Sequence, residues 1–452
     1  CRDVGFKGID TFFVTYSGVV PDDYMETILS QPEEDYRFHS LQRIETASSV
    51  RGAYQLSRQY SSVDDLKALD TVLADSDLSF FEAARMAAGH LFMKKAARVY
   101  RRGGKMLLVE DGGYVSPLIN RFCLEGKTLH ETLDWFHVDP AGLGLPTELL
   151  EGTLSDWLAP VLLGVVEHTR NGYDANLEVE SQYGRLQFPV CSIAISDLKR
   201  GPEAQECAIA ILNATENIMH RLGLLLSRRQ ALVLGSRGAI GRCALAELAH
   251  RLGPTRVAGV DIAASMDTDK APPEVTTIED LPRDLLYDTD LFVGIIGKSI
   301  ISRQTLEDLM VHSRRDRIFF ASGSTKTTEF SDLEDWLVTL QREENPTIAG
   351  HEISIEHTPL RDLQTRVTQG QIVRIQFKDK SIPDKTLNLM GNLTPINFLY
   401  YGIPREIVDE VISQLLRVSV GLTQQALQKR PLPGTLLAVD REIDIDAVLL
   451  EG

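Results

Sequence analysis

The sequence predicts an α/β protein of two domains. Its 452 residues exceed one ordinary hydrophobic core and favour two or three domains. Short apolar runs of strand length alternate with segments of helical spacing. The run at 230–234 leads through a glycine-rich loop into a helix and then into a second strand. This alternation is typical of a parallel sheet covered by helices.

The composition is that of an ordinary globular protein and excludes several partners. Hydrophobic residues make up 43% and charged residues 25% of the chain, which argues against a mostly disordered chain. A net charge of −17 is the wrong sign for nucleic acid or an anionic membrane as the main partner. The longest apolar stretch, Leu158 to Val166, contains Pro160 and Gly164 and is about half of the roughly 20 residues that a bilayer requires.

The cysteines and histidines predict neither disulfides nor a metal. Five cysteines are an odd count and form no CxxC pair, so a reducing cytoplasm is the interpretation that fits best. No carboxylate and histidine cluster has ligand spacing; His351 and His357 are six residues apart. The chain begins at Cys1 without a signal-peptide pattern, so we expect a processed or excised piece of a longer protein.

The first 150 residues are expected to be helical and irregular, with one clear helix at 83–102. The apolar run 105–110 predicts a buried strand, which Asp111, Gly112 and Gly113 end. An acid with two flexible residues at a strand end is how α/β proteins present a carboxylate at the carboxyl edge of a sheet. The alternative is a turn in which Asp111 only caps backbone amides.

Polar side chains also follow the next apolar segment. The run from Gly164 to Gly172 places an acid, an imidazole, a hydroxyl, a guanidinium and an amide after it, and this density at a strand end indicates a site. A further strand is expected at 188–195. A long helix is expected at 203–227, because that segment has no proline and its apolar residues have helical spacing.

The segment from Gln230 to Asp261 predicts a dinucleotide-binding βαβ unit. A buried strand at 230–234 precedes a glycine-rich loop, a helix follows at 242–252, and a second strand at 256–260 closes with the acid. The glycines let the backbone approach a pyrophosphate at a helix N-terminus. Asp261 is placed to accept hydrogen bonds from both adenosine ribose hydroxyls and to repel a 2′-phosphate. NAD is therefore favoured over NADP as the cofactor.

The glycine spacing in this loop is GxxGxxG instead of the more common GxGxxG. The loop has a strand before it, a helix after it and an acid at the expected distance, and these features favour cofactor binding. The alternative is a Rossmann-like domain whose glycines serve only packing. For Arg237, contact with the pyrophosphate and contact with solvent alone are both open. The residues expected at the cofactor here are Gly235, Arg237, Gly238, Ala239, Ile240, Gly241, Asp261 and Ile262.

Further strands are expected at 290–297, 317–325 and 386–392, with a helix at 304–311. Small and polar residues at their ends would line the carboxyl edge where nicotinamide and substrate meet, although plain turns have the same composition. The cofactor candidates in these segments are Gly297, Ser322, Gly323 and Asn388.

The order of these motifs resembles that of the S-adenosylhomocysteine hydrolase family, from about residue 105 to about residue 425. Residues 110–113 are similar to the family's Asp-Asp-Gly-Gly, and residues 164–172 to its Gly-Val-Ser-Glu-Glu-Thr-Thr-Thr-Gly. The remaining similar segments are 233–242 with 257–262 (the cofactor loop and ribose-binding strand), 294–301 with 319–325 (Thr-Thr-Gly-Cys and Asn-Ile-Gly-His), and 387–398 (Asn-Leu-Gly-Cys-Ala-x-Gly-His-Pro-Ser-Phe).

The resemblance implies an NAD-dependent enzyme that cleaves S-adenosylhomocysteine, or acts on a related nucleoside, by reversible oxidation of the ribose. It makes Asp111 the catalytic Asp, matches Glu167 and Thr169 to their counterparts with Glu167 as a further catalytic residue, and sets Asn171 with Thr169 near the cofactor. The family's histidines correspond to Ser324 and Thr394 in this chain.

The resemblance also places His168 where the family has its substrate-binding Glu. As a base His168 would both donate and accept hydrogen bonds, whereas a structural histidine at a domain interface needs no catalytic role. Lys199 and Asp197 are candidates by chemistry for the family's Lys and Asp that precede the cofactor loop. The C-terminal end, 442–452, lacks the Lys and Tyr with which the family's tail reaches a neighbouring subunit.

Together these observations predict an NAD-binding Rossmann domain at 209–394, inserted in a larger discontinuous α/β domain of catalytic type formed by 1–208 and 395–452. We expect domain closure over a nucleoside-like substrate and assembly into a homo-oligomer in the cytoplasm. The expected function is adenosylhomocysteinase-like. The alternatives are a catalytically silent NAD- or nucleoside-binding homologue with a regulatory role, and an NAD-linked dehydrogenase that releases NADH.

Overall fold

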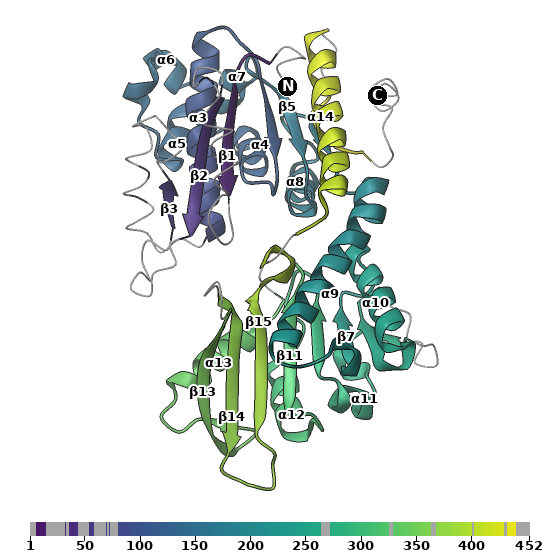
Figure 1. Ribbon diagram of the computed structural model, residues 1–452. Helices are drawn as coiled ribbons and strands as arrows, with labels where there is room; N and C mark the ends of the chain where they lie inside the picture. The colour runs from purple at the N-terminus through teal and green to yellow at the C-terminus, as the bar shows by residue number, and fades with distance from the viewer. Residues whose placement is uncertain are drawn as a thin grey trace. The chain divides into compact units, whose positions relative to one another are not determined.

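A computed structural model describes residues 6–14, 32, 36–43, 54–57, 69, 72, 80–263, 272–324, 329–362, 368–399, 402–428 and 432–439. The chain divides into two units, which are drawn in Figure 1. Unit 1 consists of residues 1–199 and 409–452, and unit 2 of residues 200–408. Features expected at Cys1, Thr325 and 442–452 lie outside the described residues.

The division differs in its bounds from the one expected. The units meet in sequence at 199/200 and 408/409, whereas the sequence pattern suggested 208/209 and 394/395. Both schemes insert one segment into another. The assignment of a substrate role to one part and a cofactor role to the other stays a prediction.

Unit 2 is built on a nine-stranded sheet with the order β12-β13-β14-β15-β11-β10-β7-β8-β9. The six strands from β15 to β9 are parallel, and β14, β13 and β12 extend the sheet antiparallel. The bounds are β7 (Ala231–Leu234), β8 (Val257–Val260), β9 (Glu274–Val275), β10 (Leu291–Gly294), β11 (Arg317–Ser322), β12 (Thr347–Ile348), β13 (His351–Arg361), β14 (Thr368–Phe377) and β15 (Lys385–Pro395).

The parallel part of this sheet has the strand order of a dinucleotide-binding Rossmann fold. Counted from β7, the order β9-β8-β7-β10-β11-β15 reads 3-2-1-4-5-6. The chain therefore leaves β7 toward one side of the sheet and returns at β10 on the other. Ligands of such sheets bind at this reversal, outside the carboxyl ends of the two central strands. The predicted α/β class with a Rossmann-type domain is confirmed.

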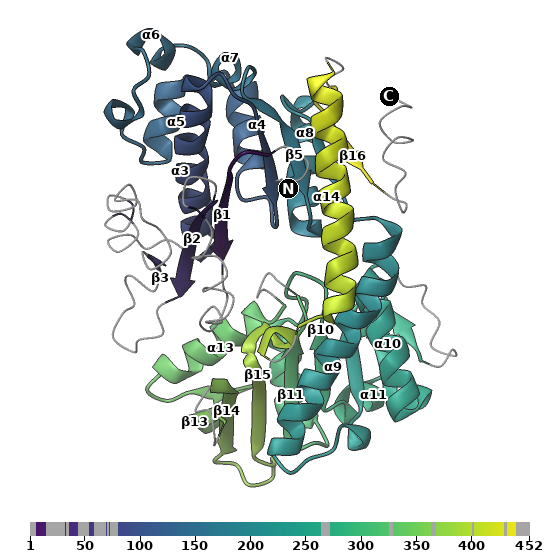
Figure 2. The same cartoon turned by 45° about the horizontal axis from the view of Figure 1, so that its top comes forward.

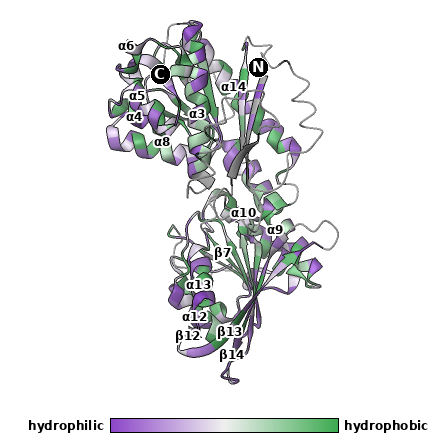
Figure 3. Cartoon of the chain, turned by 90° about the vertical axis from the view of Figure 1, so that its left-hand side faces the viewer, coloured by the Kyte–Doolittle hydropathy of each residue, from purple (hydrophilic) through white to green (hydrophobic). Residues whose placement is uncertain are grey.

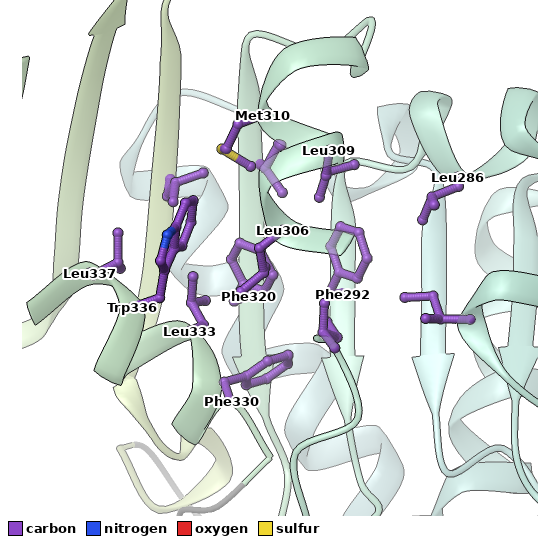
Figure 4. Close-up of a cluster of buried hydrophobic side chains, with 14 of the residues drawn as sticks. Leu286, Phe292, Leu306, Leu309, Met310, Phe320, Phe330, Leu333, Trp336 and Leu337 are labelled. Atoms are coloured by element: carbon purple, nitrogen blue, oxygen red, sulfur yellow. The ribbon is translucent and has the colours of Figure 1, made fainter. Parts of the chain in front are cut away.

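Helices cover both faces of the sheet, because its buried strands alternate two sets of apolar side chains. Val233, Val293 and Phe319 pack under α9 and α10, whereas Leu232, Phe292 and Phe320 face α11, α12 and α13. Figure 4 shows Phe292 and Phe320 stacked side by side, at 5.1 Å between ring centroids, with Leu306 of α12 and Trp336 of α13 close to them. Figure 3 shows the strands near β7 as more hydrophobic than the ends of β13 and β14.

Three helices of unit 2, α9, α10 and α12, lie where helices were predicted, with α9 shorter than expected, whereas α11 and α13 were not predicted. The segment 203–227 was expected as one helix, but α9 ends at Arg221 because Gly223 adopts a left-handed conformation (φ +70°) and reverses the chain. The bounds are α9 (Ala204–Arg221), α10 (Ala239–Leu252), α11 (Arg283–Asp288), α12 (Arg303–His312) and α13 (Ser331–Arg342), with short 3-10 helices η6 (Leu226–Arg228), η7 (Pro254–Arg256), η8 (Ile278–Asp280) and η9 (Ile396–Leu399).

Unit 1 contains a four-stranded parallel sheet with the order β16-β6-β5-β4. The strands expected at 105–110 and 188–195 are confirmed as β4 (Met106–Glu110) and β6 (Val190–Ser192). A smaller sheet of β1, β2 and β3 precedes it and was missed, because the first 150 residues were expected to be helical and irregular. The remaining strand bounds are β1 (Ile9–Val14), β2 (Tyr36–Arg43), β3 (Tyr54–Ser57), β5 (Leu162–Glu167) and β16 (Leu436–Ala438).

Helices pack on the four-stranded sheet at close range. Gly164 of β5 leaves room for Leu422 of α14, since a Cβ at Gly164 would lie 3.0 Å from the Leu422 side chain; Figure 2 shows α14 alongside β5. The bounds are α3 (Phe80–Arg101), α4 (Ser116–Leu124), α5 (Leu129–Trp135), η4 (Pro140–Leu143), α6 (Thr147–Leu150), α7 (Leu154–Leu158), α8 (Arg170–Tyr183), η5 (Lys199–Glu203, into unit 2) and α14 (Arg405–Leu427, in unit 1 from 409).

None of the helices in the described ranges is both long and apolar enough to pass through a membrane. The same part of the chain contains no group of three or more His, Cys, Asp or Glu residues that could hold a metal ion.

Candidate functional site

Two neighbouring strands of unit 1 end in glutamates that lie side by side. β4 ends at Glu110 and β5 at Glu167, and the parallel pairing sets these two residues opposite each other. Both side chains are buried. The two loops that follow carry Asp111 and His168, so the strand register itself brings the predicted acid and the predicted imidazole to one place at the carboxyl edge of the sheet.

Asp111, His168 and Lys199 form a hydrogen-bonded chain. His168 Nδ1 lies 3.0 Å from Asp111 Oδ1, and Lys199 Nζ lies 3.1 Å from His168 Nε2. The backbone fixes the position of His168, whose N–H donates to the carbonyl of Glu110 at 2.9 Å. The Asp111 side chain is 74% exposed and that of His168 is 21% exposed, so the chain of three groups is open to a small molecule.

The charges of this chain fix the roles of its atoms. An ammonium at Lys199 can only donate, so Nε2 accepts and Nδ1–H donates to the Asp111 carboxylate. Desolvation opposes ionisation of the Asp111 carboxylate, but the hydrogen bond from His168 and the positive charge of Lys199 outweigh it and hold the pKa of Asp111 below its usual value. An imidazole supported on one nitrogen by a carboxylate is an arrangement suited to general acid and base chemistry.

Glu167 organises the loops on which this chain rests. Its Oε1 accepts from the backbone N–H groups of Gly112 (3.1 Å) and Thr169 (2.7 Å) and from Thr169 Oγ1 (2.9 Å), and its Oε2 accepts from Gly113 N–H (2.9 Å). Glu167 is fully buried and therefore does not project from the site. Its contacts in the structure are those of a residue that holds two loops in place. The catalytic role predicted for Glu167 stays a prediction.

Glycines make this arrangement sterically allowed. A Cβ at Gly172 would lie 2.0 Å from both Cδ and Oε2 of Glu167, and a Cβ at Gly113 would lie 2.7 Å from the Cα of Gly172. Thr169 is the N-cap of α8, since its Oγ1 accepts from Gly172 N–H at 3.1 Å. Asn171 follows in the first turn of the same helix. The cofactor candidates Thr169 and Asn171 thus lie in unit 1.

Glu110 was not predicted as a site residue, although its position at the end of a buried strand was the available signal. Its carboxylate accepts from the backbone N–H groups of Val115 (2.5 Å) and Ser116 (3.0 Å), at the beginning of α4. Burial raises its pKa against these hydrogen bonds. Burial and the nearby charge of Glu110 raise the pKa of Glu167 to about 8, so the pair retains a proton near neutral pH.

Two of the cysteines are buried thiols. Among the described residues, Cys123 and Cys191 are free thiols and both are buried. Burial raises the pKa of both Cys123 and Cys191 to about 12, so these two thiols stay protonated and unreactive.

In unit 2 the glycine-rich loop joins β7 to α10 at the reversal of the sheet. A Cβ at Gly235 (φ +90°) would lie 2.7 Å from the carbonyl oxygen of Ile295, next to β10, and a Cβ at Gly241 would lie 1.8 Å from that of Gly235. Larger residues at either position would therefore force the loop away from the sheet. The backbone comes as close to the two central strands as a dinucleotide site requires.

The amides at the start of α10 fit a phosphate group. Gly238 is the N-cap and offers no side chain to accept from them. The first intrahelical bond is donated by Arg242 N–H to the carbonyl of Gly238 at 3.0 Å, so the N–H groups of Ala239, Ile240 and Gly241 have no acceptor within the helix. A helix N-terminus with such donors favours an anion.

Asp261 follows β8 and faces the same loop. Its Oδ2 accepts from Arg237 N–H at 3.0 Å and its Oδ1 from Ala263 N–H at 2.9 Å. Ile262 beside it is 73% exposed, which leaves an apolar surface available for a flat ring. The side chain of Arg237 pairs with Glu274 of β9, with Nε to Oε2 at 2.7 Å. No sequence pattern pointed to Glu274.

The other predicted cofactor residues divide between the sheet edge and the sheet interior. Gly297 N–H and Ser322 Oγ both donate to the buried Glu329, at 2.9 and 3.3 Å, and Gly323 N–H donates to the carbonyl of Gly294 at 2.8 Å. Asn388 instead lies within β15, buried, with its Nδ2 donating to Ile318 at 3.3 Å. Glu329 was missed by the sequence pattern, and Asn388 lies away from the edge.

Comparisons with known proteins find no family model and no curated protein that matches the chain. Among similar solved structures, a glycerate dehydrogenase related protein from Thermoplasma acidophilum is 19% identical, covers 34% of this chain and 55% of its own, and has a TM-score of 0.22. This chain thus spans about half the length of that protein.

Two further solved structures match over a larger share of both chains. A D-lactate dehydrogenase from Aquifex aeolicus complexed with NAD and lactic acid is 13% identical, covers 65% of this chain and 88% of its own, and has a TM-score of 0.31. A D-isomer specific 2-hydroxyacid dehydrogenase family protein from Aeromonas salmonicida is 12% identical, covers 76% of this chain and 99% of its own, and has a TM-score of 0.28.

These findings correct the family expected from the sequence. No family model matches the chain, and the three similar solved structures named above are two dehydrogenases and a dehydrogenase related protein, so assignment to the S-adenosylhomocysteine hydrolase family is wrong. The physical reason lies in the motifs. Two loops close around the buried side chain of Glu167, and they need small residues to do so. Asp111-Gly112-Gly113 and the segment ending at Gly172 provide these residues. The same steric requirement can arise in other protein families.

The raised pKa of Glu167 predicts a pH-dependent stability. A carboxyl group with a native pKa near 8 and an unfolded value near 4.5 binds its proton more tightly in the native state. Its contribution is fully present below pH 4.5 and is lost as the pH rises toward 8, at up to about 1.4 kcal/mol per pH unit. We expect the free energy of unfolding, measured by urea denaturation, to fall over this range.

Replacing the neighbour tests the cause of this dependence. Glu110→Gln removes the charge that raises the pKa of Glu167, so the decline with pH should become shallower even though the variant loses a hydrogen-bond acceptor. The exposed Glu148→Gln should keep the slope of the unmodified protein. A slope unchanged in Glu110→Gln would contradict the assignment.

The close packing at Gly172 gives a second prediction. Gly172→Ala forces the carboxylate of Glu167 out of its hydrogen bonds and should cost about 1–3 kcal/mol of unfolding free energy or more. It should also shift the imidazole NMR signals of His168, because the two loops separate. Gly142→Ala, where a Cβ meets nothing within 4 Å, serves as the control and should leave both measurements nearly unchanged.

Proposed function

We propose that the chain is an NAD-linked dehydrogenase that reversibly oxidises a small hydroxylated substrate. The observation that carries the proposal is the loop from Gly235 to Gly241, where two glycines permit close approach to the central strands and the amides opening α10 have no acceptor within the helix. These features, together with Asp261 at the end of β8, meet the chemical requirements of a dinucleotide.

Each part of the dinucleotide has a proposed binding residue in unit 2. The N–H groups of Ala239, Ile240 and Gly241 would hold the pyrophosphate, and Asp261 would accept from the adenosine ribose hydroxyls. Exposed Ile262 would lie against the adenine ring. Gly297, Ser322 and Gly323 lie at the strand ends that follow along the same edge and are proposed for the nicotinamide half; Arg237, Gly238 and Asn388 are proposed as supporting positions.

A bound dinucleotide supplies the hydride acceptor, and this chain must supply the proton acceptor. Oxidation of a secondary alcohol removes a hydride from carbon and a proton from oxygen, and yields a ketone and NADH. His168 is the proposed base: its Nε2 takes the hydroxyl proton, and the resulting imidazolium keeps its Nδ1–H on Asp111. Lys199 would then donate to the substrate oxygen in place of Nε2, and so stabilise the charge that develops there.

The first prediction of this proposal concerns binding. The purified protein should bind NAD in calorimetric titration, or release it on denaturation. Asp261→Ala should weaken NAD affinity about 10- to 100-fold, since a charge-assisted hydrogen bond contributes about 1.5–3 kcal/mol. Asp284→Ala, whose side chain is 83% exposed on the same unit, should bind as the unmodified protein does. Unchanged affinity in Asp261→Ala would exclude this ribose site.

The second prediction concerns turnover. A panel of 2-hydroxy acids and nucleosides with NAD should give net NADH, followed by its absorbance, for at least one compound. His168→Asn should lower kcat about 10²- to 10⁴-fold and leave NAD affinity unchanged, because the imidazole acts on the substrate proton. Tight NAD binding without turnover of any hydroxylated compound would instead favour a binding protein with a regulatory role.

A further inference from the structure

Arg237 lies in the glycine-rich loop where the proposed cofactor would present its adenosine ribose. Its backbone N–H donates to Asp261, the proposed ribose ligand, so the two residues are adjacent. An arginine near this position can bind the 2′-phosphate that distinguishes NADP from NAD, because guanidinium and phosphate form paired hydrogen bonds. By its position alone, Arg237 would therefore favour NADP.

The guanidinium group is already held by another anion. Arg237 Nε lies 2.7 Å from Glu274 Oε2, and Ser236 Oγ donates to the same oxygen at 3.0 Å. The Glu274 side chain is only 12% exposed, whereas that of Arg237 is 39% exposed. A carboxylate that is mostly buried and fixed by a second donor is a stronger competitor for the guanidinium than a mobile surface acid.

The neighbouring strands are shaped to hold this carboxylate. Glu274 of β9 pairs with Gly259 of β8, and a Cβ at Gly259 would lie 2.6 Å from Ser236 Oγ and 3.1 Å from Glu274 Cγ. A side chain at position 259 would thus displace both Ser236 and Glu274. Gly259 therefore has a specific steric role at this point of the sheet, beyond the general requirements of a buried strand.

We propose that Glu274 determines the cofactor preference of this protein by occupying Arg237. Glu274 neutralises the guanidinium and keeps it over β9, so a dinucleotide with a free 2′-hydroxyl meets Asp261, and a 2′-phosphate meets two acids without a free arginine. The inference rests on the proposed dinucleotide site and adds to it the residue that sets the choice between NAD and NADP.

The test measures NAD and NADP binding by calorimetry for four proteins: the unmodified chain, Glu274→Gln, Arg237→Ala and the double variant. The unmodified chain should prefer NAD. Glu274→Gln keeps an oxygen for Ser236 and releases Arg237, so NADP affinity should rise at least tenfold while NAD affinity stays within about threefold. In the double variant this gain should disappear.

Each outcome separates the inference from the proposed function. NADP affinity that is unchanged in Glu274→Gln, or a gain that persists without Arg237, overturns the role of Glu274 while NAD binding stands. Arg237→Ala gives an independent check that does not require Glu274→Gln to fold. It should leave the NAD to NADP ratio unchanged, and a tenfold loss of NADP affinity would show that Arg237 is not held by Glu274. If neither dinucleotide binds the unmodified chain, the proposed function itself fails.

Discussion

The buried carboxylate of Glu167 is the interaction on which the unit 1 site depends. It draws together backbone amides from two loops, the one after β4 and the one after β5, and these loops carry Asp111 and His168. Without an acceptor at this point, three N–H groups would face one another unpaired, which costs free energy in a buried setting. The exposed pair of Asp111 and His168 is thus positioned by a residue that no substrate would reach.

In both units, glycines allow the backbone to come close to an acidic group, which differs between the units. In unit 1, Gly113 and Gly172 let the backbone close around a carboxylate of the protein itself. In unit 2, Gly235 and Gly241 let the loop lie against the central strands, and the amides that open α10 find no acceptor on the N-cap Gly238. The first cradle is filled by Glu167, and the second has the chemistry to receive a phosphate.

The sequence patterns predicted those helices and strands that depend mainly on residues close together in the sequence. The apolar runs ending at Glu110 and Leu234 predicted strands, and the glycines beyond Leu234 predicted a loop and a helix start. The sheet β1-β2-β3 and the antiparallel strands β13 and β14 were not predicted, because pairing with strands distant in the sequence decides them. Glu274 and Glu329 were missed for the same reason, since each acquires its partners only through the fold.

The mistaken family assignment has a physical explanation that also limits what motifs can decide. A loop that must wrap an anion needs glycine, a short hydroxyl or acid, and a strand in front of it, and any parallel sheet supplies this setting. The short motifs at 110–113 and 164–172 therefore indicate a backbone geometry. The substrate chemistry depends instead on the side chains around that backbone. In this chain the accessible or partly accessible side chains there are Asp111, His168 and Lys199, an acid, an imidazole and an amine in one hydrogen-bonded chain, which is the kind of arrangement that suits proton transfer.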